Sequence, residues 1–152
     1  MSHERIAPRW SDPAVAEQIL RTFRTWAVVG CSSRPWRASH GVSRYLIRQG
    51  YEVVPVHPNE KEVHGLPAHR DLRSIPEDLR SRIEVVDLFR RSELVPAHVD
   101  EAIEIGAKAI WMQLEVWNEA AAKRAADAGL LVVMDRCPAI DHPSMIGTPF
   151  VA

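Results

Sequence analysis

The sequence predicts a doubly wound α/β fold, in which helices cover both faces of a five-stranded parallel sheet. Two observations predict it: five short, almost continuously apolar runs, and helical patterns that alternate with them along the chain. Strands that are apolar on both faces are typical of parallel sheets buried between helices, and right-handed crossovers favour the strand order 3-2-1-4-5. With 152 residues, 46% of them hydrophobic, the chain is expected to form one domain over residues 1–152, with its core at 13–137 and a C-terminal tail at 138–152.

The expected strands are runs of apolar, often β-branched residues bounded by turn-forming residues. Each run is short, as buried strands are, whereas helices need about ten residues or more. The second run leads into a polar loop over residues 60–73, the longest loop expected in the chain. In chain order the expected strands are Trp26–Val29, Tyr51–Val56, Ile83–Phe89, Ala109–Met112 and Leu130–Met134.

The expected helices fill the segments around these runs, where apolar residues recur at helical spacing. Pro13 and Pro96 suit first helical turns, Asn118 is a typical N-cap, and Gly50 and Gly106 suit helix ends. The C-terminal tail contains three prolines and is expected to wrap the surface without regular structure. The expected helical segments are Pro13–Phe23, Ser39–Gln49, a short turn at Ile75–Leu79, Pro96–Gly106 and Asn118–Ala128.

Composition limits the classes of partner. A formal net charge of −1 gives no global electrostatic case for nucleic acid or an anionic membrane, and the N-terminus lacks the apolar segment of a signal peptide. We therefore expect a cytoplasmic protein without a nucleic-acid or membrane partner. Whether it forms a homo-oligomer is left open. The two cysteines, Cys31 and Cys137, argue against a disulfide scaffold. The expected strand order separates them by about 9.6 Å, beyond the Cα separation of about 4.4–6.8 Å in a disulfide.

The loop after the first strand has the composition of a phosphate-binding turn. Gly30 allows a tight turn at the strand end. Ser32 and Ser33 supply hydroxyls beside backbone N–H groups that are expected to be free, and Arg34 and Arg37 supply fixed positive charge. The loop therefore predicts an anion beside a helix N-terminus.

The remaining site residues follow from topology, because ligands of open parallel sheets bind beyond the carboxyl ends of the strands, where the strand order reverses. That point is expected between the first and fourth strands. Arg136, after the fifth strand, is expected either to face the ligand or to form an ion pair that holds the tail. The candidate binding residues are Gly30, Cys31, Ser32, Ser33, Arg34, Arg37, His57, Pro58, Asn59, Phe89, Arg90, Met112, Gln113 and Arg136.

Three other kinds of site are disfavoured. The first loop lacks the second and third glycines of G-x-G-x-x-G, and the second strand ends in His57 rather than a ribose-binding acid, although Glu60 is near. Arg34 replaces the last glycine of a G-x-S-x-G nucleophile elbow. The histidines of the second loop, His57, His64 and His69, match no metal-binding spacing. No catalytic residue and no metal ligand are therefore assigned.

The chain carries five short blocks in sequence: Val29–Ser32, Val54–Pro58, Val86–Ser92, Trp111–Leu114 and Val133–Cys137. These blocks resemble those of the small bacterial and archaeal coenzyme A-binding proteins. That family is a stand-alone relative of the CoA-binding domain in the α subunit of succinyl-CoA synthetase. The resemblance covers roughly residues 20–142 and implies a Rossmann-like, nucleotide-binding domain that holds CoA across the strand ends.

The resemblance also implies roles for parts of the site. In the family, the turn that matches residues 30–35 holds phosphate, and the turn that matches 56–59 lies by the adenosine. The blocks that contain Phe89-Arg90 and Met112-Gln113 border the ligand. CoA carries a diphosphate and a 3′-phosphate, which require several N–H donors and arginine charge of the kind that residues 34, 37 and 90 supply.

Several positions within the resemblance have features of their own. His57 stands where the family usually has asparagine, and Glu60 stands near a lysine of the related synthetase domain, for which Lys61 is a candidate substitute. Trp36 is expected either to stack on the adenine or to pack against the protein. Cys31, beside a helix N-terminus and arginines, is expected to have a lowered pKa, which suggests a mixed disulfide with CoA.

The sequence as a whole favours a protein that binds CoA, or an acyl-CoA, without catalysis of its own. One alternative is an NADP- or CoA-dependent enzyme on the same fold, or a partner-dependent component of an acyl-CoA synthetase. Another is a domain that has lost ligand binding and contacts a partner through Trp117 and residues 140–151.

Overall fold

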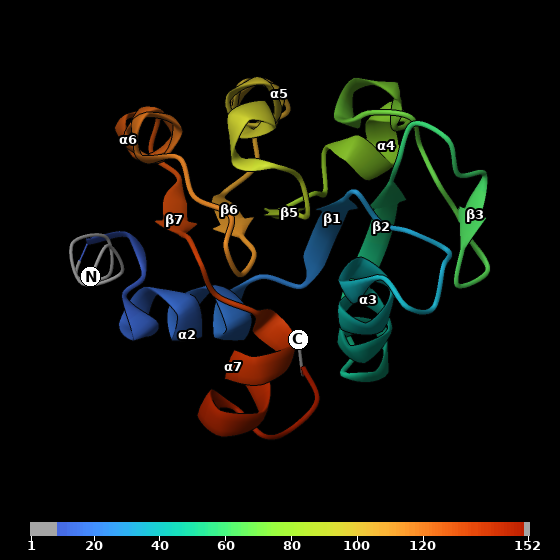
Figure 1. The fold of residues 1–152 in the computed structure, drawn as a ribbon, viewed down its shortest axis with the longest axis horizontal. Coiled ribbons are helices and arrows are strands. Elements are labelled where there is room, and N and C mark those ends of the chain that lie inside the picture. The colour runs from blue at the N-terminus through green and yellow to red at the C-terminus, as the bar shows by residue number, and fades with distance from the viewer. Residues whose placement is uncertain (1–8, 151–152) are drawn as a thin grey trace.

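The computed structural model describes residues 9–150, which form a five-stranded parallel sheet between two layers of helices (Figure 1). The sheet has the order β2-β1-β5-β6-β7, and every neighbouring pair is parallel. The predicted fold class, α/β with five parallel strands and helices on both faces, is confirmed. The strands are β1 (Thr25–Val29), β2 (Glu52–Val56), β5 (Val85–Leu88), β6 (Ala109–Met112) and β7 (Leu131–Val133).

The strand order differs from the expected 3-2-1-4-5. Counted along the chain, the order is 2-1-3-4-5, because the third strand, β5, pairs with β1 through Val28 and Asp87. The free side of β2 is instead bordered by His69, whose backbone N–H donates to the Pro55 carbonyl at 3.0 Å. Pro55 has no N–H to offer a further strand on that side, and proline within a strand is typical of a sheet edge. The order reverses between β1 and β5.

Three helices cover one face of the sheet: α2 (Pro13–Thr22), α3 (Ala38–Arg48) and α7 (Pro138–Met145). Their apolar side chains form one buried cluster with Trp26 and Trp111 of the sheet. The other face is covered by α4 (Glu77–Arg80), α5 (Val95–Glu104) and α6 (Glu119–Asp127), over a second cluster. No helix among residues 9–150 is long and apolar enough to span a membrane.

The C-terminal tail was expected to be irregular, but residues Pro138–Met145 form helix α7. Pro138 occupies its first turn, where proline needs no N–H partner. Arg136 forms an ion pair with Asp141 at 2.7 Å, and His142 is fully buried against α3. The helix also contacts α2, where the Arg21 guanidinium donates to the Met145 carbonyl at 3.2 Å. Burial and these contacts therefore fix a segment whose prolines suggested a loop.

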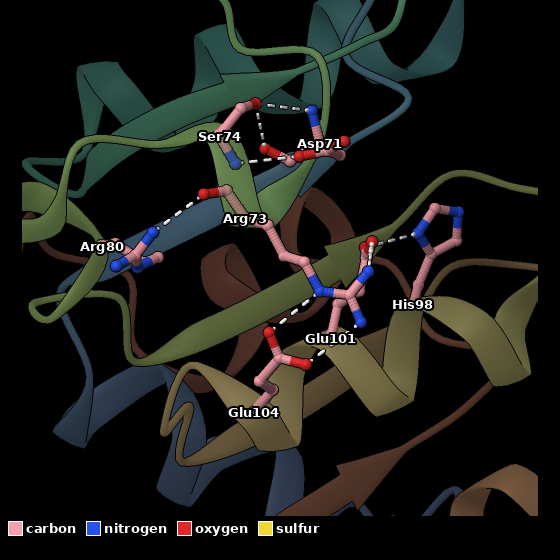
Figure 2. A network of polar contacts seen from close by, with 7 residues as sticks. All are labelled: Asp71, Arg73, Ser74, Arg80, His98, Glu101 and Glu104. Atoms are coloured by element: carbon pink, nitrogen blue, oxygen red, sulfur yellow. Dashed lines mark hydrogen bonds and ion pairs between the residues drawn. The ribbon is translucent and has the colours of Figure 1, made fainter.

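The expected loop over 60–73 contains a two-stranded hairpin, β3 (Glu62–Val63) and β4 (Leu66–Pro67), and a 3-10 turn, η1 (Leu72–Ser74). A polar network joins this turn to α5 (Figure 2). Arg73 donates from Nε to Glu104 at 2.9 Å and from Nη1 to Glu101 at 3.4 Å. Arg80 donates to the Arg73 carbonyl at 2.8 Å. The segment between β2 and β5 is thereby fixed to the helix that follows β5.

Candidate functional site

A cavity of about 900 Å³ opens at the carboxyl ends of the strands. It lies where the strand order reverses, so it is centred between β1 and β5, rather than between the first and fourth strands as expected. Loops after β1, β2, β5, β6 and β7 contribute to its walls. The predicted residues that line it are Gly30, Ser32, Ser33, Arg34, Arg37, His57, Asn59, Phe89, Arg90 and Gln113.

Four predicted site residues do not line the cavity. Cys31 and Met112 are fully buried in the two core clusters, on opposite faces of the sheet. The guanidinium of Arg136 holds the Asp141 carboxylate at 2.7 and 3.0 Å and the Ser11 carbonyl at 3.0 Å, so the structure shows the ion-pair alternative. Pro58 is exposed beside the cavity residues His57 and Asn59.

Other residues line the cavity without having been predicted. Ala38, Ser39 and Val42 come from the first turns of α3, and Glu115 and Val116 come from the loop after β6. The signal for the α3 residues was present, because the helix directly follows the phosphate-binding turn. The loop after β6 was expected to border the site through Gln113, but nothing in the local sequence extended that expectation to Glu115 and Val116.

Gly30 allows the loops after β1 and β5 to approach each other closely. Its φ is +86°, a region that favours glycine, and a Cβ placed on it would lie 2.4 Å from the Phe89 carbonyl oxygen. The Gly30 and Cys31 N–H groups both donate to the Val56 carbonyl at the end of β2, at 2.8 and 3.2 Å. The turn is thus held between the two strands that flank β1.

The backbone donors of this turn were expected to be free, and they are engaged. The Ser32 N–H donates to Ser39 Oγ at 3.0 Å, and the Arg34 N–H donates to Ser32 Oγ at 3.1 Å. Ser33 donates from its N–H and from its hydroxyl to the same carboxylate oxygen of Glu60, at 2.8 Å each. These hydrogen bonds lower the pKa of Glu60, so the carboxylate is ionised at neutral pH. An internal carboxylate therefore occupies donors that suit an anion.

The first turn of α3 presents a different anion position. Its N-cap residue, Arg37, makes no side-chain capping hydrogen bond, and Ala38 and Ser39 both line the cavity. The first N–H groups of a helix lack partners within the helix, and the helix dipole places partial positive charge there. This eleven-residue helix therefore directs the positive end of its dipole toward the cavity.

Charge in the cavity is predominantly positive. The side chains of Arg34, Arg37, Arg90 and Arg91 line it, against the carboxylates of Glu60 and Glu115. Burial lowers the pKa of His57 below its usual value, and the charges of three of these arginines lower it further, while Glu60 opposes them. His57 is therefore neutral at pH 7, and its Nδ1 accepts the Asn59 N–H at 3.0 Å. Such a wall suits a ligand with several negative charges.

The thiol pKa of both cysteines is raised, whereas a lowered pKa was expected for Cys31. Burial raises the pKa of the Cys31 thiol to about 11, despite a hydrogen bond with Ser43, and burial also raises the pKa of Cys137. Both cysteines are buried and outside any disulfide, and of the two only Cys137 lines the cavity. The prediction of a lowered pKa for Cys31, on which the suggested mixed disulfide with CoA depended, is therefore wrong.

Asp87 lies at the centre of the sheet, in β5, with no exposed surface. Neither carboxyl oxygen has a hydrogen-bond partner among residues 9–150. Burial raises the pKa of Asp87 well above its usual value, because desolvation disfavours the charged carboxylate.

The histidines of the second loop separate in space. His57 borders the cavity, whereas His64 binds Ser43 Oγ at 2.9 Å and packs its ring against His40 at 4.3 Å between centroids. The backbone of His69 bridges to β2. Across the described part of the chain, no group of three or more histidine, cysteine, aspartate or glutamate side chains is placed to hold a metal ion.

Comparisons with known proteins agree with this geometry. The family described as CoA binding domain matches residues 24–143. The uncharacterized protein YneT of Bacillus subtilis (strain 168) is 38% identical over 133 residues, which cover 86% of this chain and 96% of that protein.

Solved structures show the same architecture. A hypothetical protein from Pyrococcus horikoshii OT3 superposes with a TM-score of 0.83 and is 37% identical, covering 90% of this chain and 93% of its own. The dinucleotide-forming acetyl-coenzyme A synthetase 1 of Ca. Korarchaeum cryptofilum superposes with a TM-score of 0.64 over 74% of this chain and 26% of its own. At 22% identity, that second likeness shows the fold alone.

Proposed function

Because this chain belongs to the family of CoA binding domains, we propose that it binds coenzyme A, or an acyl-CoA, in the cavity at the strand ends. The proposal places this activity in one domain that acts in the cytoplasm. Its partner is a small-molecule cofactor rather than nucleic acid or a membrane.

The observation that carries the proposal is the convergence of four arginines and the N-terminus of α3 on one cavity. CoA carries a diphosphate and a 3′-phosphate, and multiply charged phosphates are bound by arginine side chains and helix N-termini. Arg34 and Arg37 border the first turn of α3, and Arg90 lies across the reversal point after β5. The cavity volume of about 900 Å³ is within the range of cofactor sites.

The chemistry of the cavity supports binding without catalysis by this chain. The Ser32 hydroxyl accepts the Arg34 N–H and is almost completely buried, and burial raises the pKa of both thiols. A serine hydrolase needs a histidine beside its nucleophile, and His142, which follows Ser32 in the chain, instead binds the Tyr45 hydroxyl at 2.7 Å on the α7 side. Among the described residues, Ser32 and the two thiols therefore lack the activating partners that covalent catalysis requires.

Isothermal titration calorimetry with CoA, acetyl-CoA, NAD and NADP tests the proposal. CoA or acetyl-CoA should bind, and Arg34→Ala should weaken that binding about 10-fold through the loss of a charged phosphate contact. Arg48→Ala, an exposed arginine at the far end of the same helix, is the matched control and should leave affinity unchanged. Failure of the wild-type protein to bind either CoA compound, or equal binding of NAD, would overturn the proposal.

A further inference from the structure

One wall of the cavity contains an unsatisfied hydrogen-bond acceptor. Gln113 directly follows β6, lines the cavity, and is only 5% exposed. Its side-chain oxygen, Oε1, has no hydrogen-bond partner among the described residues. Leaving a buried amide oxygen unpaired costs about 1–3 kcal/mol, so a ligand that donates to it gains affinity.

The amide of the Gln113 side chain already makes one hydrogen bond. A hydrogen bond between its amide and Cys137 lowers the pKa of that thiol, although burial raises it more. The Gln113 backbone N–H donates to the Leu88 carbonyl at 3.3 Å. Oε1 is the atom of this side chain that is buried without a partner among the described residues, and it accepts hydrogen bonds only.

The surroundings of Gln113 differ from those of the phosphate-binding turn. In the sheet, β6 lies two strands from β1, a distance of about 9.6 Å at the usual spacing. On the β1 and β5 side the cavity is bordered by four arginines. Near Gln113 its walls include Leu114, Val116 and Cys137, together with Glu115 and its carboxylate. The cavity therefore has one side bordered by four arginines and another side without arginines, where Gln113 Oε1 is the buried acceptor that has no partner among the described residues.

These two sides match the two halves of CoA, whose phosphates are anionic and whose pantetheine arm is uncharged and carries two amide N–H donors. Resting on the proposed function, we infer that the β6 and β7 side of the cavity holds the pantetheine arm and that Gln113 Oε1 accepts a hydrogen bond from one of its amide N–H groups. Phosphates at neutral pH offer Gln113 no comparable donor, and a thiol is a weak one. Gln113 thus selects ligands that carry the arm over nucleotides that lack it.

The test compares CoA with adenosine 3′,5′-bisphosphate, which retains the ribose phosphates but lacks pantetheine. Gln113→Met keeps a side chain of similar length and removes the acceptor. We expect it to weaken CoA binding about 5- to 30-fold and to leave the bisphosphate unchanged, measured as a competitor of CoA so that weak binding is still quantified. Gln18→Met, the same exchange at an exposed position of α2, should change neither affinity.

Each outcome decides between hypotheses. If folded Gln113→Met, checked by thermal unfolding, binds CoA as tightly as the wild type, the role of Gln113 is overturned. An equal loss of affinity for CoA and for the bisphosphate would also overturn it, because Gln113 would then act on the nucleotide. A wild-type protein that binds no CoA compound overturns the proposed function itself, which is a distinct result.

Discussion

Replacing Asp87 with asparagine should change how the stability of the protein depends on pH. Asp87 is fully buried without a hydrogen-bond partner among residues 9–150, and burial raises its pKa well above the ordinary value of 3.8. In the unfolded chain the same carboxyl ionises near that ordinary value. The folded state therefore binds one more proton than the unfolded state at pH values between the two pKa values, and its stability falls as the pH rises through that window.

The magnitude follows from proton linkage. One proton of difference changes the free energy of unfolding by about 1.4 kcal/mol for each pH unit, or about 2.7 kcal/mol between pH 5 and 7 if the window spans both values. Asparagine has nearly the same shape and does not ionise, so Asp87→Asn should remove this slope. Relative to the wild type, the variant should become progressively more stable from pH 4.5 upward, until the pH reaches the folded-state pKa of Asp87.

Urea unfolding of both proteins, measured at half-unit intervals from pH 4.5 to 7.5, gives this difference directly. Asp78→Asn, at an exposed position of α4, serves as the control and should run parallel to the wild type. A difference between wild type and Asp87→Asn that stays constant over the whole range would refute the reasoning, because Asp87 would then be ionised in the folded protein.

Three further predictions concern the loops and thiols of the site. Gly30→Ala should lower the free energy of unfolding by about 2 kcal/mol or more, since the new Cβ would lie 2.4 Å from a carbonyl oxygen; Gly41→Ala, where a Cβ meets nothing within 4 Å, should be neutral or stabilising in thermal unfolding. Glu60→Gln should tighten CoA binding about 2- to 5-fold at low salt, because it removes a carboxylate from an anion site, and an unchanged affinity in calorimetry would contradict this. Cys31 and Cys137 should react slowly with iodoacetamide at pH 8 until urea unfolds the protein, because burial raises the pKa of both thiols. Equal reaction rates in the presence and absence of urea would contradict this prediction.

Local features of the fold could be predicted well from the sequence. The fourth expected strand coincides with β6, Ala109–Met112, because a short apolar run between two helical patterns leaves little choice of boundary. Asn118 caps α6 as expected, and its side chain accepts the Ala121 N–H at 3.0 Å. Such features depend on neighbours within a few residues, so composition and spacing specify them.

Features that depend on distant partners were harder to predict. The strand order is set by which sheet edge β5 joins, and Pro55 was the one local sign that β2 is an edge strand. The N–H and hydroxyl of Ser33 donate to Glu60, which is 27 residues further along the chain. The path of the loop that carries Glu60 cannot be predicted from residue spacing. The prolines of the tail did not prevent a helix, because Pro138 lies in the first turn of α7 and the helix continues past Pro143. That helix places Asp141 where it forms the ion pair with Arg136.

The contact between α2 and α7 has a consequence for how the protein is made. Arg21 donates to the Met145 carbonyl, and Arg136 donates to the Ser11 carbonyl, across 124 and 125 residues of chain. A ribosome synthesises α2 first among the described helices and α7 last, so these hydrogen bonds cannot form until nearly all of residues 9–150 have emerged. Contacts between such distant segments slow folding, because the chain must close a long loop before they contribute. During synthesis, the part of the sheet face that α7 covers is therefore exposed until this last helix has emerged. Its apolar residues are accessible to chaperones for that interval.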